Sequence, residues 1–376
     1  MGVLGMVVLV ALMERHLDRQ PLELNENTPT CWRFAQTQAR KQAAQAEILC
    51  FGSSVVKFGV LPAIIAEKTG RPTFNLAVYG GRMASSYYLF KRALEAGAKP
   101  AAVIVDCQDG PVPIAKAREL SEAVASNSRN WPEILQTREI LELAWHAGDP
   151  NVLAATTLAR AFPSIKARHE IRTQIMASLE GKETPARHNN LVLLRNWNAN
   201  RGAQVMPAVA PAAETVASLD SPAADLPEGQ YFPNPFMDVY VRKFLDLARD
   251  RKIPVFWVMA PLSPQVMTMQ HNAGYERFAT DCANAIQRRY ANVVVVDGRR
   301  SGYSSGAFLD ATHLNVTGNA SLSEDLAEVI AERLSGKARG SRWVFLPPYH
   351  PRTPNHSTED FQKSWAVVAP ATRNRY

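Results

Sequence analysis

The chain has 376 residues, of which 46% are hydrophobic and 20% charged, a balance that predicts a globular protein with one sizeable core and an insertion, or two modest domains. Its net charge of +7 comes from scattered Lys and Arg residues without interleaved aromatic residues, which argues against a nucleic-acid-binding protein. An anionic polysaccharide or a phospholipid surface would still suit this charge. The four cysteines form no C-x-x-C pair and the histidines form no H-x-x-x-H pair, so we expect neither a metal nor a cofactor.

Residues 1–13 are almost wholly apolar and are followed by Glu14, Arg15 and His16. A membrane-spanning helix needs about 20 apolar residues, and a secretory signal would have a basic first region and a cleavage site of small residues. We therefore expect a truncated membrane anchor, which would place the polar bulk outside the cytoplasm, in the periplasm or at the cell surface. The alternative is a buried core helix in a cytoplasmic protein. Residues 14–45 are polar and rich in Gln and Ala, and we expect a connector there.

Residues 46–110 alternate between strand-like and helix-like stretches. The apolar runs Glu47–Phe51, Thr73–Val78 and Ala101–Val105 are separated by segments with a helical pattern. The third run is almost continuously apolar, as expected of a strand that is buried on both faces. Such alternation predicts a parallel sheet with helical crossovers.

The alternation stops in residues 111–230, which we predict to be a helical insertion followed by a linker. Trp131–Ala147 and Val152–Leu179 have helical patterns. Pro207–Pro227 is instead rich in Ala, Pro and Ser and lacks apolar periodicity, so we expect a flexible loop there.

The rhythm of strands and helices returns in residues 231–337, which we predict to be the second half of the same α/β domain. Strands are expected at Ile253–Met259 and Val293–Val296, with helices before and after them. The sequence therefore predicts a sheet of five strands in total. Residues 338–376 form a basic tail rich in Pro and aromatic residues, which we expect to wrap over the core or to contact a partner.

Small and polar residues follow the ends of the predicted strands. Open parallel sheets bind ligands outside the carboxyl ends of their strands, so residues that are distant in the sequence are expected to converge on one crevice. The residues concerned are Ser53 and Ser54, Gly80 and Gly81, Asp106 to Asp109, and Ser263.

Ser54 is the candidate nucleophile. It is expected to begin the helix after the first strand, where unpaired amide groups and the helix dipole favour negative charge. The alternative is an ordinary serine that caps the helix, and Ser53 competes for that capping role.

Asp310 and His313 are the candidate acid and base. A carboxylate that accepts a proton from one imidazole nitrogen leaves the other nitrogen free to take the proton of a serine hydroxyl. Their spacing in Asp310–Asn315 suits this arrangement. The alternative is a loop without chemistry, in which Asn315 or Thr317 caps the following helix.

These blocks together resemble the SGNH/GDSL hydrolase superfamily. The chain has Gly52-Ser53-Ser54 after the first strand, Asn75 and Gly80 at the second, a polar tetrapeptide at the third and Asp310-Ala311-Thr312-His313 before the last helix. The resemblance implies an α/β fold of the flavodoxin-like type, a three-layer sandwich with a parallel five-stranded sheet, to which this chain adds the helical insertion.

The resemblance also implies roles for individual residues. Ser54 would be the nucleophile, with His313 as base and Asp310 as its carboxylate partner. The oxyanion hole would contain the amides of Ser54 and Gly80 and the side chain of Gln108, which stands where the family has Asn. Ser53, Asp109 and Ser263 are further candidates to line the crevice.

We therefore expect a serine hydrolase that acts on ester bonds through an acyl-enzyme, either a carbohydrate acetylesterase or an O-acyltransferase. Its partner would be an ester-bearing small molecule or an acylated polysaccharide, and the N-terminus would associate with a membrane. The alternative is a catalytically impaired protein of the same fold that serves as a binding or assembly module at the membrane surface.

Overall fold

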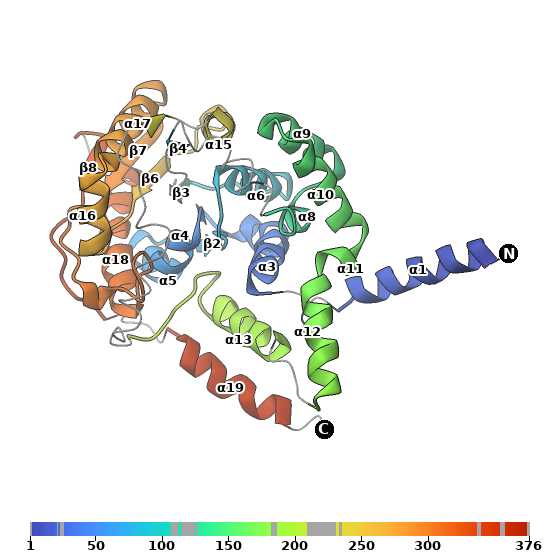
Figure 1. The fold of residues 1–376 in the computed structure, drawn as a ribbon. Coiled ribbons are helices and arrows are strands. Elements are labelled where there is room, and N and C mark those ends of the chain that lie inside the picture. Colours follow the sequence, from blue (N-terminus) through green and yellow to red (C-terminus); the bar gives the residue numbers. More distant parts are fainter. Residues whose placement is uncertain are drawn as a thin grey trace. The chain divides into compact units, whose positions relative to one another are not determined.

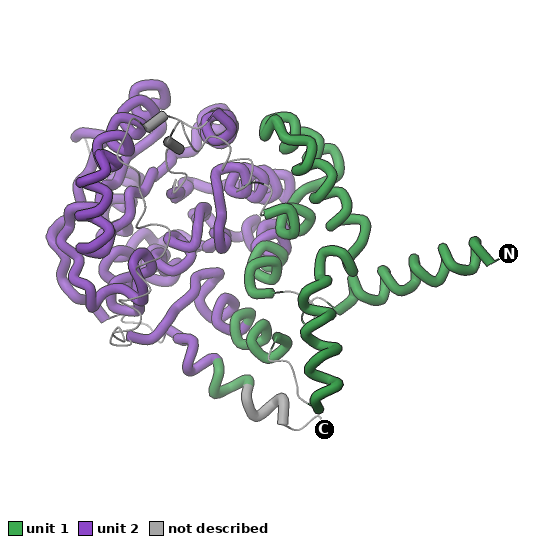
Figure 2. The backbone as a smooth tube through the Cα atoms, viewed as in Figure 1, with its two compact units in different colours: residues 1–34, 118–194, 365–376 green, residues 35–117, 195–364 purple. Residues whose placement is uncertain are grey.

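The chain divides into two units in the computed structural model, each made from separate stretches of sequence (Figure 2). Unit 1 contains residues 1–34, 118–194 and 365–376, and unit 2 contains residues 35–117 and 195–364. Most of the linker expected at Pro207–Pro227 lies outside the residues that the structure describes. The described residues are 2–20, 22, 26–106, 112–113, 124, 127–181, 186–208, 231–232, 235–336, 340–353 and 358–373.

Unit 2 is built around a parallel sheet of six strands in the order β2-β1-β3-β6-β7-β8 (Figure 1). In chain order this is 2-1-3-4-5-6, so the direction of winding reverses between β1 and β3. The prediction of a parallel α/β sheet is confirmed. The strands are β1 (Ile48–Phe51), β2 (Thr73–Asn75), β3 (Ala102–Asp106), β6 (Val255–Met259), β7 (Val293–Asp297) and β8 (Trp343–Phe345).

The predicted number of five strands is wrong, because the tail supplies a sixth. Trp343–Phe345 pairs in parallel with β7 at the edge of the sheet. This strand has three residues, none of them fully buried, and Pro347 and Pro348 follow it closely. A short, half-exposed edge strand lacks the buried apolar run by which the central strands are recognised.

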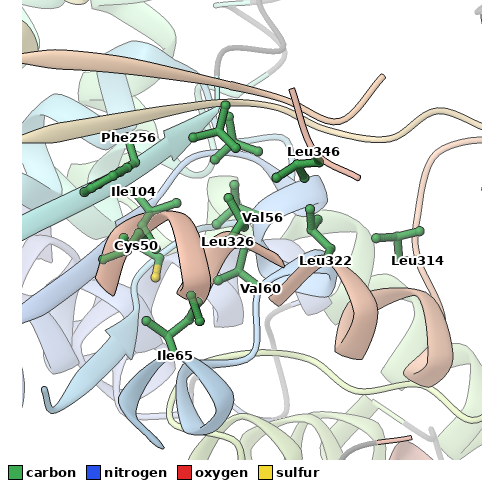
Figure 3. Packing of buried hydrophobic residues seen from close by; sticks show 14 of the residues in the cluster. Cys50, Val56, Val60, Ile65, Ile104, Phe256, Leu314, Leu322, Leu326 and Leu346 are labelled. Carbon is green, nitrogen blue, oxygen red and sulfur yellow. The ribbon is translucent and has the colours of Figure 1, made fainter. Parts of the chain in front are cut away.

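Both faces of the sheet are covered by helices. On one face, Phe51 packs against Phe90 of α6 and Phe244 of α15, at ring-centroid distances of 5.3 and 5.8 Å. The other face carries the alternate residues of each strand, as the period of two requires. Figure 3 shows that face, with Cys50, Ile104 and Phe256 packed near Val56, Val60, Ile65, Leu322 and Leu326.

The helices wholly within unit 2, apart from η1, which precedes β1, lie between consecutive strands, as parallel crossovers require. A short antiparallel pair, β4 (Val112–Pro113) with β5 (Tyr231–Phe232), joins the two ends of the insertion. The helices are η1 (Ala43–Gln45), α4 (Ser54–Gly59), α5 (Pro62–Thr69), α6 (Met83–Glu95), α15 (Pro235–Asp250), α16 (Pro264–Asn272), α17 (Tyr275–Arg289), η5 (Ser305–Ala307) and α18 (Val316–Leu334).

Unit 1 is helical, and its helices differ from the predicted ones at proline and capping residues. The predicted helix Val152–Leu179 is divided where Pro163 begins a new helix. Trp131–Ala147 is divided at Gln136, whose amide donates to the Glu139 carboxylate at 2.8 Å. The helices wholly within unit 1 are α1 (Gly2–Asp18), α8 (Trp131–Ile134), α9 (Thr137–Ala147), α10 (Pro150–Ala161), α11 (Pro163–Lys166) and α12 (Arg168–Leu179).

Three further helices pass from one unit to the other: α3 (Asn27–Lys41), α13 (Ala186–Ala199) and α19 (Phe361–Arg373). Helix α3 lies within the segment that we expected to be a polar connector. Besides its Gln residues, α3 has an apolar face that includes Trp32. The Trp32 side chain is fully buried, and its ring packs edge-on against that of Trp131 at a centroid distance of 4.9 Å. Because the other face of α3 is polar, the composition of this segment did not indicate a helix that contributes to the core.

Helix α1 contains the apolar N-terminal segment. None of its side chains is buried, and Val3, Leu4 and Leu9 are among those more than half exposed, so the alternative of a core helix is wrong. Glu14 attaches the helix to unit 1 by accepting a hydrogen bond from the Ser164 amide at 2.9 Å. Among the described residues, no helix combines the length and apolarity that a membrane span requires.

Candidate active site

The chain turns sharply at Gly52, between β1 and α4. Gly52 has a φ of +133°, and a β-carbon placed there would lie 1.8 Å from Oδ1 of Asp106. Glycine is therefore required at this position, both for its backbone conformation and for the close approach of the carboxylate.

Asp106, the last residue of β3, fixes this turn through Ser53. Its Oδ1 accepts a hydrogen bond from the Ser53 amide at 2.9 Å, and its Oδ2 accepts one from the Ser53 hydroxyl at 2.6 Å. The same hydroxyl oxygen accepts a bond from the Val55 amide at 3.1 Å, so Ser53 is the N-cap of α4. Both residues are buried, whereas Ser54, the first residue of α4, is partly exposed.

The other end of α4 is held by Asn75, the last residue of β2. The amide nitrogen of its side chain donates to the carbonyl oxygens of Val56 and Val60, at 2.9 and 3.1 Å. Its side-chain oxygen accepts a hydrogen bond from the Ala77 amide at 3.0 Å. Asn75 is fully buried, so these bonds are protected from water and fix the short helix that carries Ser54.

Asp310 and His313 lie in the loop between η5 and α18. Of the two candidate caps, the loop uses Asn315, whose side-chain oxygen accepts bonds from the amides of Thr317 and Gly318 at 3.0 and 3.2 Å. The side-chain amide of Asn315 also donates to the Gly306 carbonyl at 2.7 Å. The capping residue therefore secures the loop next to the helix.

The structure brings Ser54, His313 and Asp310 together. Nε2 of His313 lies 2.7 Å from the Ser54 hydroxyl oxygen, and Nδ1 of His313 lies 2.7 Å from Oδ2 of Asp310. Oδ1 of Asp310 accepts hydrogen bonds from the amides of Thr312 and His313, at 2.8 and 2.9 Å. The two bonds of the imidazole connect a hydroxyl to a carboxylate, which is the arrangement of a nucleophile, a base and an orienting acid.

This arrangement favours an ionised Asp310. Burial favours the neutral carboxyl, but the hydrogen bond and the charge of His313, together with the amides of Thr312 and His313, outweigh it and lower the pKa of Asp310 to about 2. An ionised Asp310 that accepts the proton of Nδ1 leaves Nε2 as an acceptor for the Ser54 hydroxyl.

Phe58 packs against the base. Its ring centroid lies 4.8 Å from that of His313, and the ring of Tyr79 stacks on Phe58 at 6.0 Å. Phe58 was not among the residues predicted from the sequence, although its position four residues after Ser54 indicates that the two share one face of a helix. Packing against Phe58 restricts the orientation of the imidazole.

The glycine turn after β2 lies beside the turn at Gly52. A β-carbon on Gly81 would lie 2.3 Å from the Gly52 carbonyl oxygen, which accepts a hydrogen bond from the Val78 amide at 3.1 Å. Gly80, the candidate oxyanion donor, is exposed and has a φ of +58°. The two turns therefore meet at the edge of the sheet where Ser54 lies.

The remaining candidates have other positions. Ser53 and Ser263 were expected to line the crevice, but the structure buries both of them as helix caps, with the Ser263 hydroxyl accepting a hydrogen bond from the Val266 amide at 3.5 Å. Gln108 and Asp109 lie outside the described residues.

A scan against protein-family models finds no match to this chain, and a search of curated proteins finds no significant relative. The chemical arrangement of the side chains therefore provides the evidence on function.

Of two cavities in unit 2, one lies beside this site and the other lies away from it. One of about 320 Å³ is lined in part by Val55 and Thr312, the neighbours of Ser54 and His313 in the sequence. A larger one of about 570 Å³ lies at Thr73, the first residue of β2, at the opposite end of that strand from the site. Within the described ranges, no group of His, Cys, Asp and Glu side chains is arranged to hold a metal ion.

Proposed function

We propose that this protein is a serine-dependent ester hydrolase or acyltransferase of the SGNH type. The observation that carries the proposal is the position of His313, with one ring nitrogen 2.7 Å from the Ser54 hydroxyl and the other 2.7 Å from the Asp310 carboxylate. The strand order of the sheet and the approach of the Gly80–Gly81 turn to Gly52 further support the SGNH resemblance.

In the proposed reaction, Nε2 of His313 takes the proton of the Ser54 hydroxyl while the Ser54 oxygen attacks the carbonyl carbon of an ester. The tetrahedral intermediate expels the alcohol, which receives the proton from His313, and an acyl group remains on Ser54. His313 then deprotonates the acceptor, whose oxygen attacks the acyl carbonyl on Ser54. The second tetrahedral intermediate expels the Ser54 oxygen, which takes the proton back from His313, and the acyl group leaves on the acceptor. Asp310 stabilises the imidazolium in both steps.

The oxyanion of the intermediate requires donors beside Ser54. We propose the amides of Ser54 and Gly80, with the side chain of Gln108 as a third donor. Loss of a single oxyanion donor typically lowers kcat about 10²–10³-fold. Gln108→Ala is therefore expected to slow acylation by that amount if Gln108 fills this role, and a loss below threefold would remove it from the oxyanion hole.

A fluorophosphonate probe tests the proposed nucleophile. The probe should label the purified protein, and Ser54→Ala and His313→Ala should each abolish labelling. Ser335→Ala is a matched control, because Ser335 is an exposed serine at the far end of α18. A folded protein that the probe does not label would refute the enzyme and favour a binding or assembly module.

The acceptor decides between the two reactions. Water as acceptor gives an esterase, and the hydroxyl of a carbohydrate gives an O-acyltransferase. Incubation with p-nitrophenyl acetate and an acceptor oligosaccharide distinguishes them, because acylated sugar appears by mass spectrometry only if the acyl-enzyme transfers its acyl group to the sugar.

We propose that α1 attaches the protein to a membrane surface on the extracytoplasmic side. Its exposed apolar side chains, among them Val3, Leu4 and Leu9, form a patch of the kind that contacts lipid or another protein. Flotation with phosphatidylcholine vesicles should recover the intact chain, and a variant lacking residues 1–13 should stay unbound. Equal recovery of the two would refute the attachment.

A further inference from the structure

The cavity of about 320 Å³ beside the triad has no role in the proton transfers described above. It extends from the carboxyl end of β6 along α15 and α17. Its lining is mostly apolar and includes Met237 and Val241 of α15, Trp257 and Met259 of β6, and Phe278 and Ile286 of α17.

The lining of the cavity includes the sequence neighbours of two triad residues. Val55, which follows Ser54, lines it from α4, and Thr312, which precedes His313, lines it from the loop. A group that is bonded to the Ser54 oxygen could therefore extend into the cavity. The alcohol portion of an ester leaves during the reaction, whereas the acyl portion stays on the serine.

The charged residues in the lining already have partners in the protein. Asp238 is paired with Arg242 at 2.6 Å, and Arg299 is paired with Asp297 at 2.7 Å. The carboxylate of Asp106 accepts its hydrogen bonds from Ser53. These pairs leave an apolar lining that favours methylene groups over a charged or hydroxylated ligand.

The volume of the cavity determines the size of the group that it can hold. A water molecule occupies about 30 Å³ of liquid, and a methylene group is of comparable size, so about 320 Å³ holds a chain of roughly eight to ten carbons. An acetyl group would leave most of the cavity without contacts, which forfeits the dispersion energy of its lining.

We propose that this cavity binds the acyl chain of the substrate, and that the substrates are esters of medium-chain aliphatic acids of about eight to ten carbons. This inference rests on the proposed serine mechanism and specifies its substrate class. It departs from the acetyl esters that the sequence suggested.

The test is a chain-length series of p-nitrophenyl esters, from acetate to dodecanoate, on the intact protein. The value of kcat/KM should rise about three- to fourfold per added methylene, which corresponds to the ~0.8 kcal/mol of a buried methylene, and should level off near eight to ten carbons. A flat series, or one that falls beyond the acetate, would overturn the proposal.

Two variants on opposite sides of the cavity provide an independent readout. Ala279→Phe adds a ring from α17 and should lower the ratio of kcat/KM for octanoate to that for acetate at least thirtyfold. Met259→Ala enlarges the cavity and should move the optimum to longer chains. Ala291→Phe, the same substitution at an exposed residue just beyond α17, should leave the ratio within twofold of the wild type.

Fluorophosphonate labelling separates failure of this inference from failure of the proposed function. A chain that the probe labels at Ser54 but that shows a flat ester series retains the serine mechanism and loses the acyl cavity. A chain without labelling loses both. An Ala279→Phe protein that is labelled normally but slows all esters equally would also overturn the acyl assignment.

Discussion

Nε2 of His313 lies 2.7 Å from the hydroxyl oxygen of Ser54, although 259 positions of the chain separate the two residues. Each of them lies beside a helix N-cap, Ser53 for α4 and Asn315 for α18. The caps and their hydrogen bonds position the two side chains, so we expect that neither Ser54 nor His313 is needed for folding. Substitution of a reacting group should therefore remove activity and leave stability nearly unchanged.

Asp310→Asn should lower kcat for ester hydrolysis by about 10³–10⁴-fold, because a neutral amide neither fixes the productive tautomer of His313 nor stabilises the imidazolium. The measurement is the steady-state rate on a p-nitrophenyl ester, with circular dichroism to verify folding. Asp250→Asn, at an exposed aspartate that ends α15, is the control. A loss of less than tenfold in Asp310→Asn would show that Asp310 has no part in the reaction.

The lowered pKa of Asp310 predicts a pH-dependent contribution to stability. An acid whose pKa falls from 3.8 in the unfolded chain to about 2 in the folded protein stabilises the fold above pH 3.8, and the contribution is lost as the pH falls through about 2. The side chain is 43% exposed, so solvent screening keeps the effect small.

Urea unfolding of the wild type and of Asp310→Asn between pH 2 and pH 6 measures this contribution. The difference in unfolding free energy should be constant above about pH 4 and should shrink toward pH 2. A difference that grows as the pH falls would have the wrong sign and would contradict the ionised Asp310.

Gly52→Ala should destabilise the turn between β1 and α4. The alanine would require a φ near +133° and would place its β-carbon 1.8 Å from the Asp106 carboxylate, so we expect a loss of more than ~3 kcal/mol and no fluorophosphonate labelling. Gly97→Ala is the matched control, with a φ of +95° and open space around the added carbon. Its cost should stay within the ~1–3 kcal/mol of the backbone conformation alone.

Ser263→Ala distinguishes a helix cap from a residue of the crevice. Loss of the cap of α16 should reduce the unfolding free energy by ~1 kcal/mol and leave kcat/KM within threefold of the wild type. Thermal unfolding and ester kinetics on the same preparation measure both quantities. Unchanged stability with a tenfold slower reaction would assign Ser263 to the substrate instead.

Strong local signals in the sequence predicted the central strands, whereas Ser54, Asp310 and His313 were predicted because the blocks that contain them follow the order of the SGNH/GDSL resemblance. Each central strand is a buried apolar run, and Asp310 with His313 is a local pair that one loop can assemble. Local patterns are less informative where one residue type can have several roles. A serine after a strand suits a nucleophile, a cap or a crevice residue, and only the hydrogen bonds of Ser53 to Asp106 and Val55 distinguish these roles.

The parts of the fold that were not predicted depend on contacts between residues that are distant in the sequence. Helix α3 is recognised as part of a core through the contact of Trp32 with Trp131, about a hundred positions away, and β8 becomes a strand through its pairing with β7. Helix α3 has few apolar residues, and β8 is an apolar run of only three residues that prolines soon follow, so periodicity alone identifies neither of them. Phe58 likewise acquires a role through its contact with the ring of His313.

The large separation between Ser54 and His313 also has a consequence during biosynthesis. A ribosome that adds about 5–20 residues per second takes roughly 13–52 seconds to travel from one codon to the other. The serine of a nascent chain therefore emerges long before its base, and a prematurely terminated product that ends before His313 has no means to activate it. Under the proposed mechanism, the chain therefore gains its reactivity only when translation is nearly finished.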